Sequence, residues 1–213
     1  MMRPASHRAR RGFTLVELMI VIAIIGVLAA LAIYGVRRYL ASAKTSEAKN
    51  TVGAIARGAA AAYENEISAA QLLPEGTVST GASNLLCASN GADAPGHGPV
   101  PGALGQVAAV KYQPITSDGF DFETGTSQGG WRCLRFSVTQ PIAYQYHYNA
   151  GSNYLSNDMT GAPPLAGTSF EAAAQGDLDG DGSGSTFARA GTVNTATRQL
   201  LLSTQVFMDN EFE

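Results

Sequence analysis

The sequence predicts an α+β protein in which a long N-terminal α-helix, with a protruding apolar half, packs on an antiparallel β-sheet of four or five strands. Three observations support this class. An apolar run near the N-terminus is long enough to cross a membrane, an amphipathic helical pattern follows it, and segments of strand character fill the second half. The 213 residues suffice for one ordinary domain plus a protruding element. We divide the chain into four segments: a short basic N-terminal segment (residues 1–12), an apolar helix (13–36), an amphipathic second half of that helix (37–72) and a loop-rich β domain (73–213).

The apolar run covers residues 13–36 and carries a single charge, Glu17. Its 24 residues make roughly 36 Å of helix, which exceeds the hydrocarbon core of a bilayer. Arginines flank the run on both sides. Because a lone carboxylate near hydrocarbon is costly and usually marks function, Glu17 needs an explanation of its own.

A second helical pattern runs over residues 42–70. Apolar side chains recur there at spacings of three and four residues, which gives one face suited to packing. The members of this stripe are Val52, Ile55, Ala59, Ala62 or Tyr63, and Ile67. Pro74 and Gly76 should stop the helix, which we expect to end at about Gln71.

The remainder of the chain is expected to form loops and strands. Residues 77–130 are rich in Gly and Pro and predict a long loop region with short strands. Tyr144, Tyr146 and Tyr148 alternate and so share one strand face, which is more typical of a core or subunit interface than of a cofactor site. His147 faces the other way and is expected to be an ordinary strand residue. The strand candidates are 131–139, 142–149, 170–175, 185–190 and 198–207.

Three interpretations of the N-terminal segment compete. Ala41-Ser42-Ala43 resembles the cleavage site of a secretory signal peptide, but residues 34–40, with two arginines, separate it from the apolar run. A plain membrane anchor leaves Glu17 unexplained. A third interpretation rests on residues 10–21, which read Arg-Arg-Gly-Phe-Thr-Leu-Val-Glu-Leu-Met-Ile-Val. This segment closely resembles the processing motif of type IV prepilins and of the related type II secretion pseudopilins.

The resemblance implies roles for three residues. Gly12 would end a leader that prepilin peptidase removes, and Phe13 would become the N-methylated N-terminus. Glu17 would pair, during assembly, with the α-amino group of Phe13 on a neighbouring subunit. The resemblance is dense over residues 10–33 and departs at Tyr34, where many pilins have a proline that loosens the helix.

The function implied by the resemblance is structural: a subunit of a type IV pilus-like extracellular filament. Its partners would be copies of itself, related pilins, prepilin peptidase and the inner-membrane assembly machinery. The chain would be a single-pass inner-membrane precursor in a Gram-negative bacterium. A pseudopilin of a type II secretion system, in a periplasmic pseudopilus, is the alternative. A third class is an anchored binding or sensory module, in which Glu17 should be dispensable.

Charge and motifs argue against two other classes. Removal of residues 1–12 takes four arginines, which leaves ten basic and seventeen acidic residues and moves the net charge from −3 to about −7. Nucleic-acid binding is not expected of such a chain. The sequence contains no GxSxG, HExxH, P-loop or clustered CxxC motif, so we do not expect an enzyme.

The two cysteines, Cys87 and Cys133, lie in the part of the chain that would be exported. An even number of cysteines in an exported domain favours a disulfide. Two unrelated buried thiols are the alternative.

An acidic segment, residues 176–183, reads Gly-Asp-Leu-Asp-Gly-Asp-Gly-Ser. Carboxylates on alternate residues can converge on a hard cation, so Asp177, Asp179 and Asp181 are candidate calcium ligands, with Ser183 contributing its carbonyl. A solvated hairpin turn is the alternative. No other cofactor is expected.

The calcium motif is incomplete. Ala188 stands where an EF-hand has its bidentate glutamate. We expect the missing ligand to come from Glu171 or from the acidic C-terminal tail, with Ser185 contributing through water.

Overall fold

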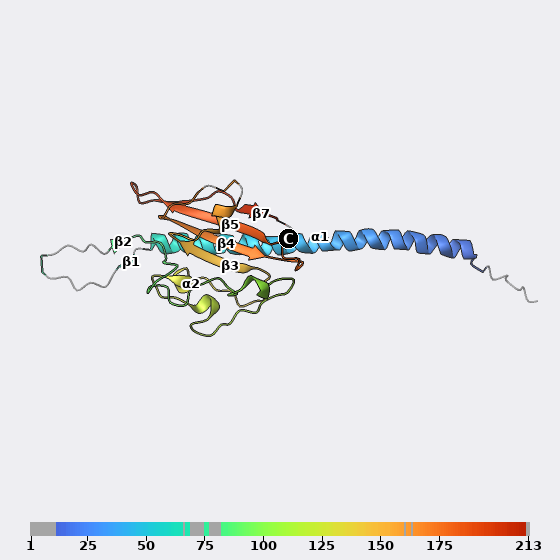
Figure 1. The fold of residues 1–213 in the computed structure, drawn as a ribbon, viewed down its shortest axis with the longest axis horizontal. Helices are drawn as coiled ribbons and strands as arrows, with labels where there is room; N and C mark the ends of the chain where they lie inside the picture. Colours follow the sequence, from blue (N-terminus) through green and yellow to red (C-terminus); the bar gives the residue numbers. More distant parts are fainter. Residues whose placement is uncertain are drawn as a thin grey trace, which may run out of the picture. The chain divides into compact units, whose positions relative to one another are not determined.

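The computed structural model describes residues 12–65, 67–68, 75–76, 82–159, 161–162 and 164–211. The first eleven residues of the predicted leader lie outside this range. The chain divides into two compact units, Met1–Leu40 and Ala41–Glu213. Helix α1, Leu15–Glu64, contributes residues to both units, and each unit is described by itself (Figure 1).

In the first unit, α1 begins at Leu15 and continues through Tyr34 without interruption. Its large apolar side chains between Leu15 and Leu40 are all exposed, by 49–74%. By length and composition this helix is able to cross a membrane. The chain itself therefore leaves the apolar side chains of this segment uncovered.

In the second unit, α1 buries the predicted apolar stripe, including Val52, Ile55 and Ala59. The expected helix end at Gln71 is wrong, because α1 ends at Glu64 and Ile67–Ser68 forms strand β1. Asn65 explains the early end: its side-chain amide donates to the Ala61 carbonyl at 2.8 Å. Such local side-chain bonds compete with helix continuation. Strand β1 pairs antiparallel with β2, Ala82–Ser83.

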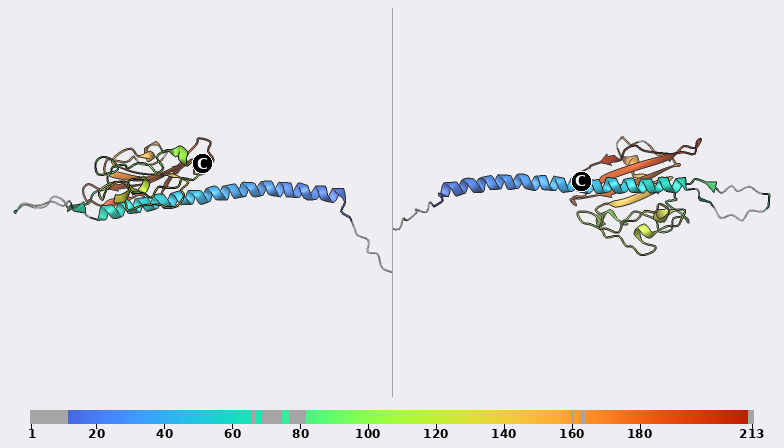
Figure 2. Two further views of the ribbon diagram at one scale, coloured as in Figure 1. Left: turned by 90° about the horizontal axis from the view of Figure 1, so that it is seen from below. Right: turned by 180° about the vertical axis from the view of Figure 1, so that it is seen from behind.

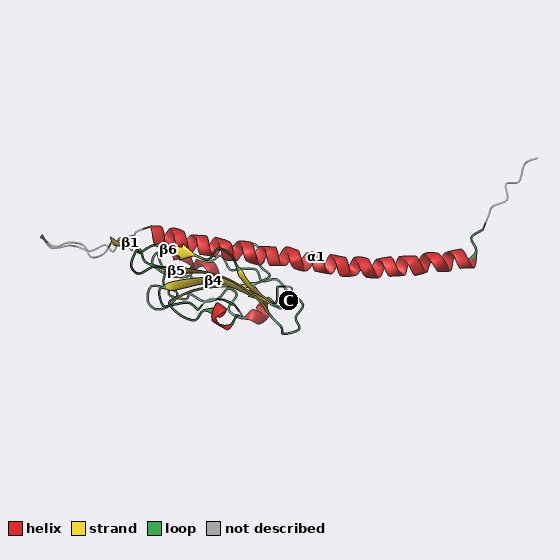
Figure 3. Ribbon diagram, turned by 90° about the horizontal axis from the view of Figure 1, so that it is seen from above, coloured by secondary structure: helices red, strands yellow, loops and turns green. Residues whose placement is uncertain are grey.

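The main sheet has five antiparallel strands, as predicted. Its order is β3-β4-β5-β6, and β7 also pairs with β5. Figures 2 and 3 show the sheet lying along residues 41–64 of α1, so helix and sheet form two layers. The strands are β3 Gln145–Ala150, β4 Ser169–Gly176, β5 Ser185–Val193, β6 Leu200–Leu202 and β7 Phe207–Asp209.

Two strand predictions need correction. Residues 131–139 are not a strand: Gly130–Cys133 is a short helix, α2, and the chain then turns at Arg135, whose φ is +49°. Cys133 and Leu134 are both buried at the end of this short helix. The segment 198–207 is not one strand: it contains β6 and only the first residue of β7, which continues to Asp209.

The core lies between α1 and the sheet. Fully buried aromatic side chains dominate it, and β4 presents Ala172 and Ala174 to the same cluster. Ala173 faces a second cluster with Met159 and Ala188, so both faces of β4 are covered. The large core residues are Trp131, Tyr144, Tyr146, Tyr148, Phe170 and Phe187.

Candidate functional site

The start of helix α1 is organised by Thr14 and Glu17. The Thr14 backbone N–H and hydroxyl both donate to Glu17 Oε2, each at 2.8 Å, and the Glu17 N–H donates to Thr14 Oγ1 at 3.2 Å. This is a reciprocal capping box, which satisfies backbone donors that the first helical turn leaves free. The spacing Thr-x-x-Glu is a sequence signal for this capping box, and it was missed because Glu17 was assigned to assembly alone.

Gly12 and Phe13 precede the helix. Neither is helical, and Phe13 is 87% exposed. The Gly12–Phe13 peptide bond therefore lies ahead of the helix and its capping box.

The predicted disulfide between Cys87 and Cys133 is present, with Cα atoms 5.8 Å apart. Both cysteines are buried. The Tyr148 hydroxyl donates to the Cys87 carbonyl at 3.0 Å, which ties the bridge to strand β3. The disulfide thus fixes α2 and the segment after it to the sheet.

The acidic segment forms the turn between β4 and β5, and it brings three carboxylates together. One ligand oxygen from each of Asp177, Asp179 and Asp181 lies within 4.8 Å of the others. Asp177 accepts the N–H groups of Gly180 at 2.6 Å and Gly182 at 3.1 Å. These bonds make Asp177 a structural cap of the turn as well as a candidate ligand.

The outer part of this turn is also internally bonded. The Ser183 N–H donates to Asp181 Oδ1 at 2.6 Å. The Ser185 hydroxyl donates to the Gly176 carbonyl at 3.0 Å and closes the base of the turn. The segment therefore folds as a capped hairpin turn that presents two exposed carboxylates, those of Asp179 and Asp181.

The expectation that Glu171 completes a cation site is wrong. Glu171 is fully buried in β4 and accepts the N–H groups of Leu155 at 2.7 Å and Ser156 at 2.8 Å. It caps the short 3-10 helix η3, Leu155–Asp158, and stands six residues, roughly 20 Å of strand, from Asp177. In the acidic tail, Glu211 pairs with Lys49, and Glu213 lies outside the described residues.

The three alternating tyrosines of strand β3 and the residue before it belong to the core, as expected. Tyr144, Tyr146 and Tyr148 are at most 1% exposed. Burial raises the pKa of Tyr144 to about 12 and raises the pKa of the other two as well. These hydroxyls remain protonated at every physiological pH and offer no acid–base chemistry.

His147 has a neighbour that the sequence did not predict. Burial, together with the proximity of His97, lowers the pKa of His147 to about 4. Burial also lowers the pKa of His97, whose Nε2 donates to the Tyr148 carbonyl at 2.9 Å. The His97 ring packs on Trp131, with ring centroids 5.3 Å apart.

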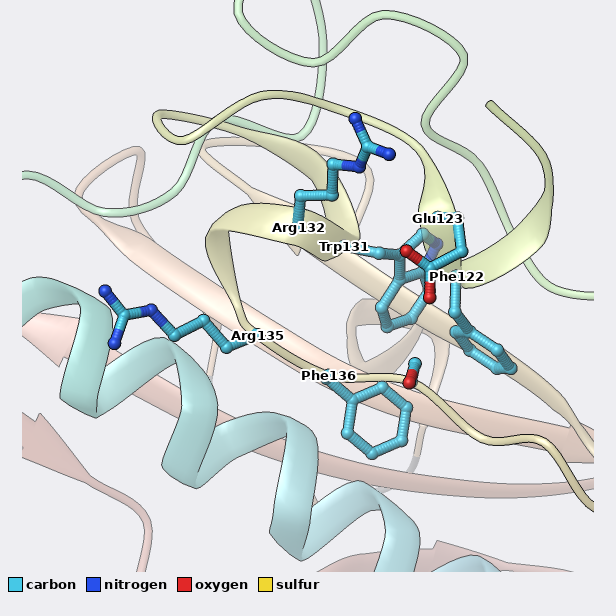
Figure 4. A pocket seen from close by; sticks show the side chains of 7 residues that line it. Phe122, Glu123, Trp131, Arg132, Arg135 and Phe136 are labelled. Atoms are coloured by element: carbon cyan, nitrogen blue, oxygen red, sulfur yellow. The ribbon is translucent and has the colours of Figure 1, made fainter. Parts of the chain in front are cut away.

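A cavity of about 240 Å³ was also not predicted. Residues 122–123, 131–132 and 135–137 line it (Figure 4). Two segments separated in sequence meet there, because the Arg132 N–H donates to the Thr124 carbonyl at 3.1 Å. The sequence signal there is a pair of arginines three residues apart within the otherwise apolar segment Trp-Arg-Cys-Leu-Arg-Phe.

Comparison with known proteins agrees with the N-terminal features. Residues 7–33 match the family model described as the prokaryotic N-terminal methylation motif. This match defines the chain as one that carries a prepilin-type N-terminus.

Three relatives extend the similarity. A fimbrial protein of Moraxella nonliquefaciens is 34% identical over 113 residues, which are 52% of this chain and 61% of the relative. Type IV major pilin protein PilA of Myxococcus xanthus is 58% identical over 45 residues, 21% of this chain and 20% of the relative. Fimbrial protein Q of Moraxella bovis is 40% identical over 148 residues, 58% of this chain and 92% of the relative.

The chain belongs to the type IV pilin family, whose members are structural rather than enzymatic. It spans less than two thirds of two of these relatives, at 61% and 20% of their lengths. No solved structure matches the chain.

Proposed function

We propose that this protein is a structural subunit of a type IV pilus-like extracellular filament. The observation that carries the proposal is the uncovered apolar segment Leu15–Leu40, which overlaps the methylation motif at residues 7–33 and extends beyond it. Exposed apolar side chains over this length require either lipid or other helices around them. A membrane-bound precursor and a filament core supply these two environments in turn.

Processing would precede assembly. Prepilin peptidase would cleave after Gly12 and methylate the new N-terminus at Phe13. The exposed, non-helical Gly12–Phe13 bond is consistent with this step. Related pilins and the inner-membrane assembly machinery are the further partners we propose.

Glu17 would then guide assembly through its charge. Its Oε2 is engaged by Thr14, whereas its Oε1 accepts no hydrogen bond from the described residues. A carboxylate surrounded by apolar helices needs a cationic partner. The α-amino group of Phe13 on a neighbouring subunit would provide it, and subunits packed out of register would lack this contact.

The test replaces Glu17 with glutamine in the native host. Glu17→Gln keeps the side-chain shape and can still accept from Thr14, but it loses the charge. We expect a processed, membrane-resident subunit and at least a tenfold loss of filaments in sheared surface fractions, because a buried amine would lack its counter-ion. Glu64→Gln, at the exposed opposite end of α1, is the matched control and should assemble normally. Undiminished filaments in Glu17→Gln would refute the assembly role of the Glu17 charge, whereas a wild type that forms no surface filaments would favour an anchored module that never polymerises.

A pseudopilin of a type II secretion system is the alternative, supported by the acidic turn, since calcium loops occur in that class. Fractionation separates the two. A pilus subunit is released by shearing cells, whereas a pseudopilus subunit stays in the periplasmic and membrane fractions.

We also propose that the acidic turn binds calcium weakly. Three carboxylates this close repel one another unless a cation neutralises them. They supply only part of the six to eight oxygens that calcium prefers, so water would complete the shell and the affinity would be low.

A further inference from the structure

Two arginines meet on one side of helix α1, over Gly53. This glycine is buried, and a Cβ added to it would lie 3.4 Å from Nη1 of Arg57 and 3.8 Å from Nη1 of Arg189. Arg57 reaches this point from the next turn of the helix, and Arg189 reaches it from strand β5. Because both nitrogens approach the same point so closely, the two guanidinium groups are close neighbours.

This arginine pair, Arg57 and Arg189, has no counter-ion within its own subunit. Neither side chain forms an ion pair among the described residues. Nε of Arg189 donates to the Ser203 carbonyl at 3.3 Å, which holds this side chain in place, and Arg57 is exposed. Carboxylates are not scarce, since residues 41–213 contain sixteen acidic and only eight basic residues. Two adjacent cations repel each other unless an anion neutralises them, so one subunit alone leaves this pair electrostatically incomplete.

The acidic turn between β4 and β5 has the opposite excess of charge. Oxygens of Asp177, Asp179 and Asp181 lie within 4.8 Å of one another, and none of the three residues forms an ion pair within the described part of the chain. The Ala109 N–H donates to the Asp177 carbonyl at 2.9 Å and so holds the turn in place. The turn therefore presents a fixed, compact group of negative charges, two of them exposed.

The arginine pair and the acidic turn do not meet within one subunit. The turn ends before Ser185, where β5 begins, and Arg189 is four residues further along that strand. Four residues of strand span roughly 13 Å, whereas a direct ion pair requires about 4 Å or less between the charged atoms. A second copy of the chain is able to supply the counter-charge that each group lacks.

A filament of identical subunits needs two different surfaces that fit each other. When copies are related by an open helical repeat, one patch of each subunit contacts a different patch of the next subunit. The arginine pair and the acidic turn are two such patches, because they are opposite in charge and both compact. Complementary charges of this kind fix the register of an interface and exclude misplaced partners.

We propose that the arginine pair of one subunit binds the acidic turn of a neighbouring subunit in the filament, with Arg57 opposite Asp179. This inference rests on the proposed filament function, and it adds a contact between globular units to the one made by Glu17. Arg57 is the exposed arginine of the pair, and Asp179 makes only a 3.3 Å bond inside its own turn. Calcium would compete with the guanidinium groups for the same oxygens, so millimolar calcium should loosen this contact.

Charge reversal in the native host tests the contact. Arg57→Glu alone places two like charges opposite each other, and so does Asp179→Lys alone. In low-calcium medium, we expect each variant to reduce the filaments in sheared surface fractions by at least about tenfold, because like charges facing each other disfavour the interface. Near-UV circular dichroism of the detergent-solubilised subunits verifies that they are folded. If Arg57→Glu does not fold, Arg57→Gln replaces it and should give a severalfold loss.

Expressing the two variants together distinguishes a contact between subunits from an effect inside one subunit. An Arg57→Glu subunit can then lie between two Asp179→Lys subunits, with opposite charges at every contact. We expect filaments to return and to contain both variants in similar amounts by mass spectrometry. Arg198→Glu is the matched control, since Arg198 is exposed and lies outside the arginine pair. It should assemble alone, and filaments from its mixture with Asp179→Lys should exclude the latter.

Two outcomes would overturn the inference: either single charge-reversed variant assembles as well as the wild type, or the two folded variants fail to restore filaments when expressed together. Failure of the proposed function would look different, because the wild type itself would then give no surface filaments. That result would overturn both proposals.

Discussion

At the scale of single residues, Thr14 and Glu17 combine two roles in one short motif. The capping box fixes where α1 begins, and it also holds the Glu17 carboxylate in a defined position next to the mature N-terminus. A carboxylate held in place by its own helix loses less side-chain entropy when a neighbouring subunit arrives. If Glu17 guides assembly as proposed, Thr14 would matter for assembly as well.

Replacing Thr14 tests this role. Thr14→Val keeps the shape of the side chain but removes the hydroxyl that both donates to Glu17 and accepts its N–H. We expect the helix start to lose about 1 kcal/mol of stability, the usual effect of a lost cap. Amide hydrogen exchange over residues 15–18 in micelles should accelerate severalfold. Thr14→Ser, which keeps the hydroxyl, is the control, and equal exchange rates in all three proteins would contradict the role.

The two histidines give the globular unit a pH dependence. The pKa of His147 is lowered to about 4 and that of His97 is lowered as well, whereas an unfolded histidine titrates near 6.5. Between these values the unfolded chain binds more protons than the folded one, so the free energy of unfolding falls as the pH falls. The side chains recorded around the pair are Tyr148, Trp131 and Gln145, none of which is charged.

We expect the melting temperature to decrease from about pH 7 to about pH 4. His147 alone accounts for up to about 3 kcal/mol over this interval, because each pKa unit corresponds to about 1.4 kcal/mol. His147→Gln removes the titrating group and should flatten the decrease. If this variant and the wild type lost stability in parallel, the carboxylates rather than the histidines would control acid sensitivity.

At the scale of elements, the acidic turn between β4 and β5 is stable as a turn whether or not it holds an ion. Asp177 already bonds two backbone N–H groups, so its substitution would damage the turn itself. Asp179 makes only a long 3.3 Å bond to the Asp181 N–H, so its carboxylate charge can be removed with little structural cost.

The difference between these aspartates gives a calcium test. Millimolar calcium should raise the melting temperature of the wild type, whereas magnesium should have little effect because it resists partial dehydration. Asp179→Asn should abolish the calcium response while keeping the metal-free melting temperature. If calcium did not raise the melting temperature of the wild type, the calcium proposal would be refuted. The segment would then be a solvated hairpin turn.

Elements that follow simple periodicity were predictable from the sequence, and elements set by local bonds were not. Strands β4 and β5 emerge from short apolar segments bounded by Gly and Asp, and α1 emerges from its apolar spacing. The end of α1 was missed because it depends on one side-chain bond from Asn65. Residues 131–139 were mistaken for a strand because apolar residues recur there mostly at every second position, and nothing local reveals the turn at Arg135.

The functional residues were likewise predictable where a contiguous sequence motif defines them, and were missed where contacts in the folded protein define them. Gly12, Phe13 and Glu17 belong to one contiguous motif, and the two cysteines have only each other to pair with, so both were predicted. The cavity was not, because its walls come from two segments that meet only in the folded protein. Glu171 was misassigned for a related reason, since its backbone partners at Leu155 and Ser156 lie sixteen and fifteen residues away.

At the scale of the whole molecule, the two units of the chain differ in the kind of surface that they expose. Residues 15–40 supply uncovered apolar surface, and the described residues from Ala41 onward form a disulfide-bonded, acidic domain. The apolar side chains of the first unit require lipid or other helices around them, whereas the second unit buries its own apolar core. A precursor held in a membrane and then transferred into a filament uses both.

The intact mass and N-terminal sequence of the protein recovered from sheared surface filaments test this account most directly. We predict a chain that begins at N-methylated Phe13 and is abundant in the sheared fraction. A chain beginning at Lys44 would contradict it, because such a protein would have lost Glu17 and the apolar helix to an ordinary signal peptidase.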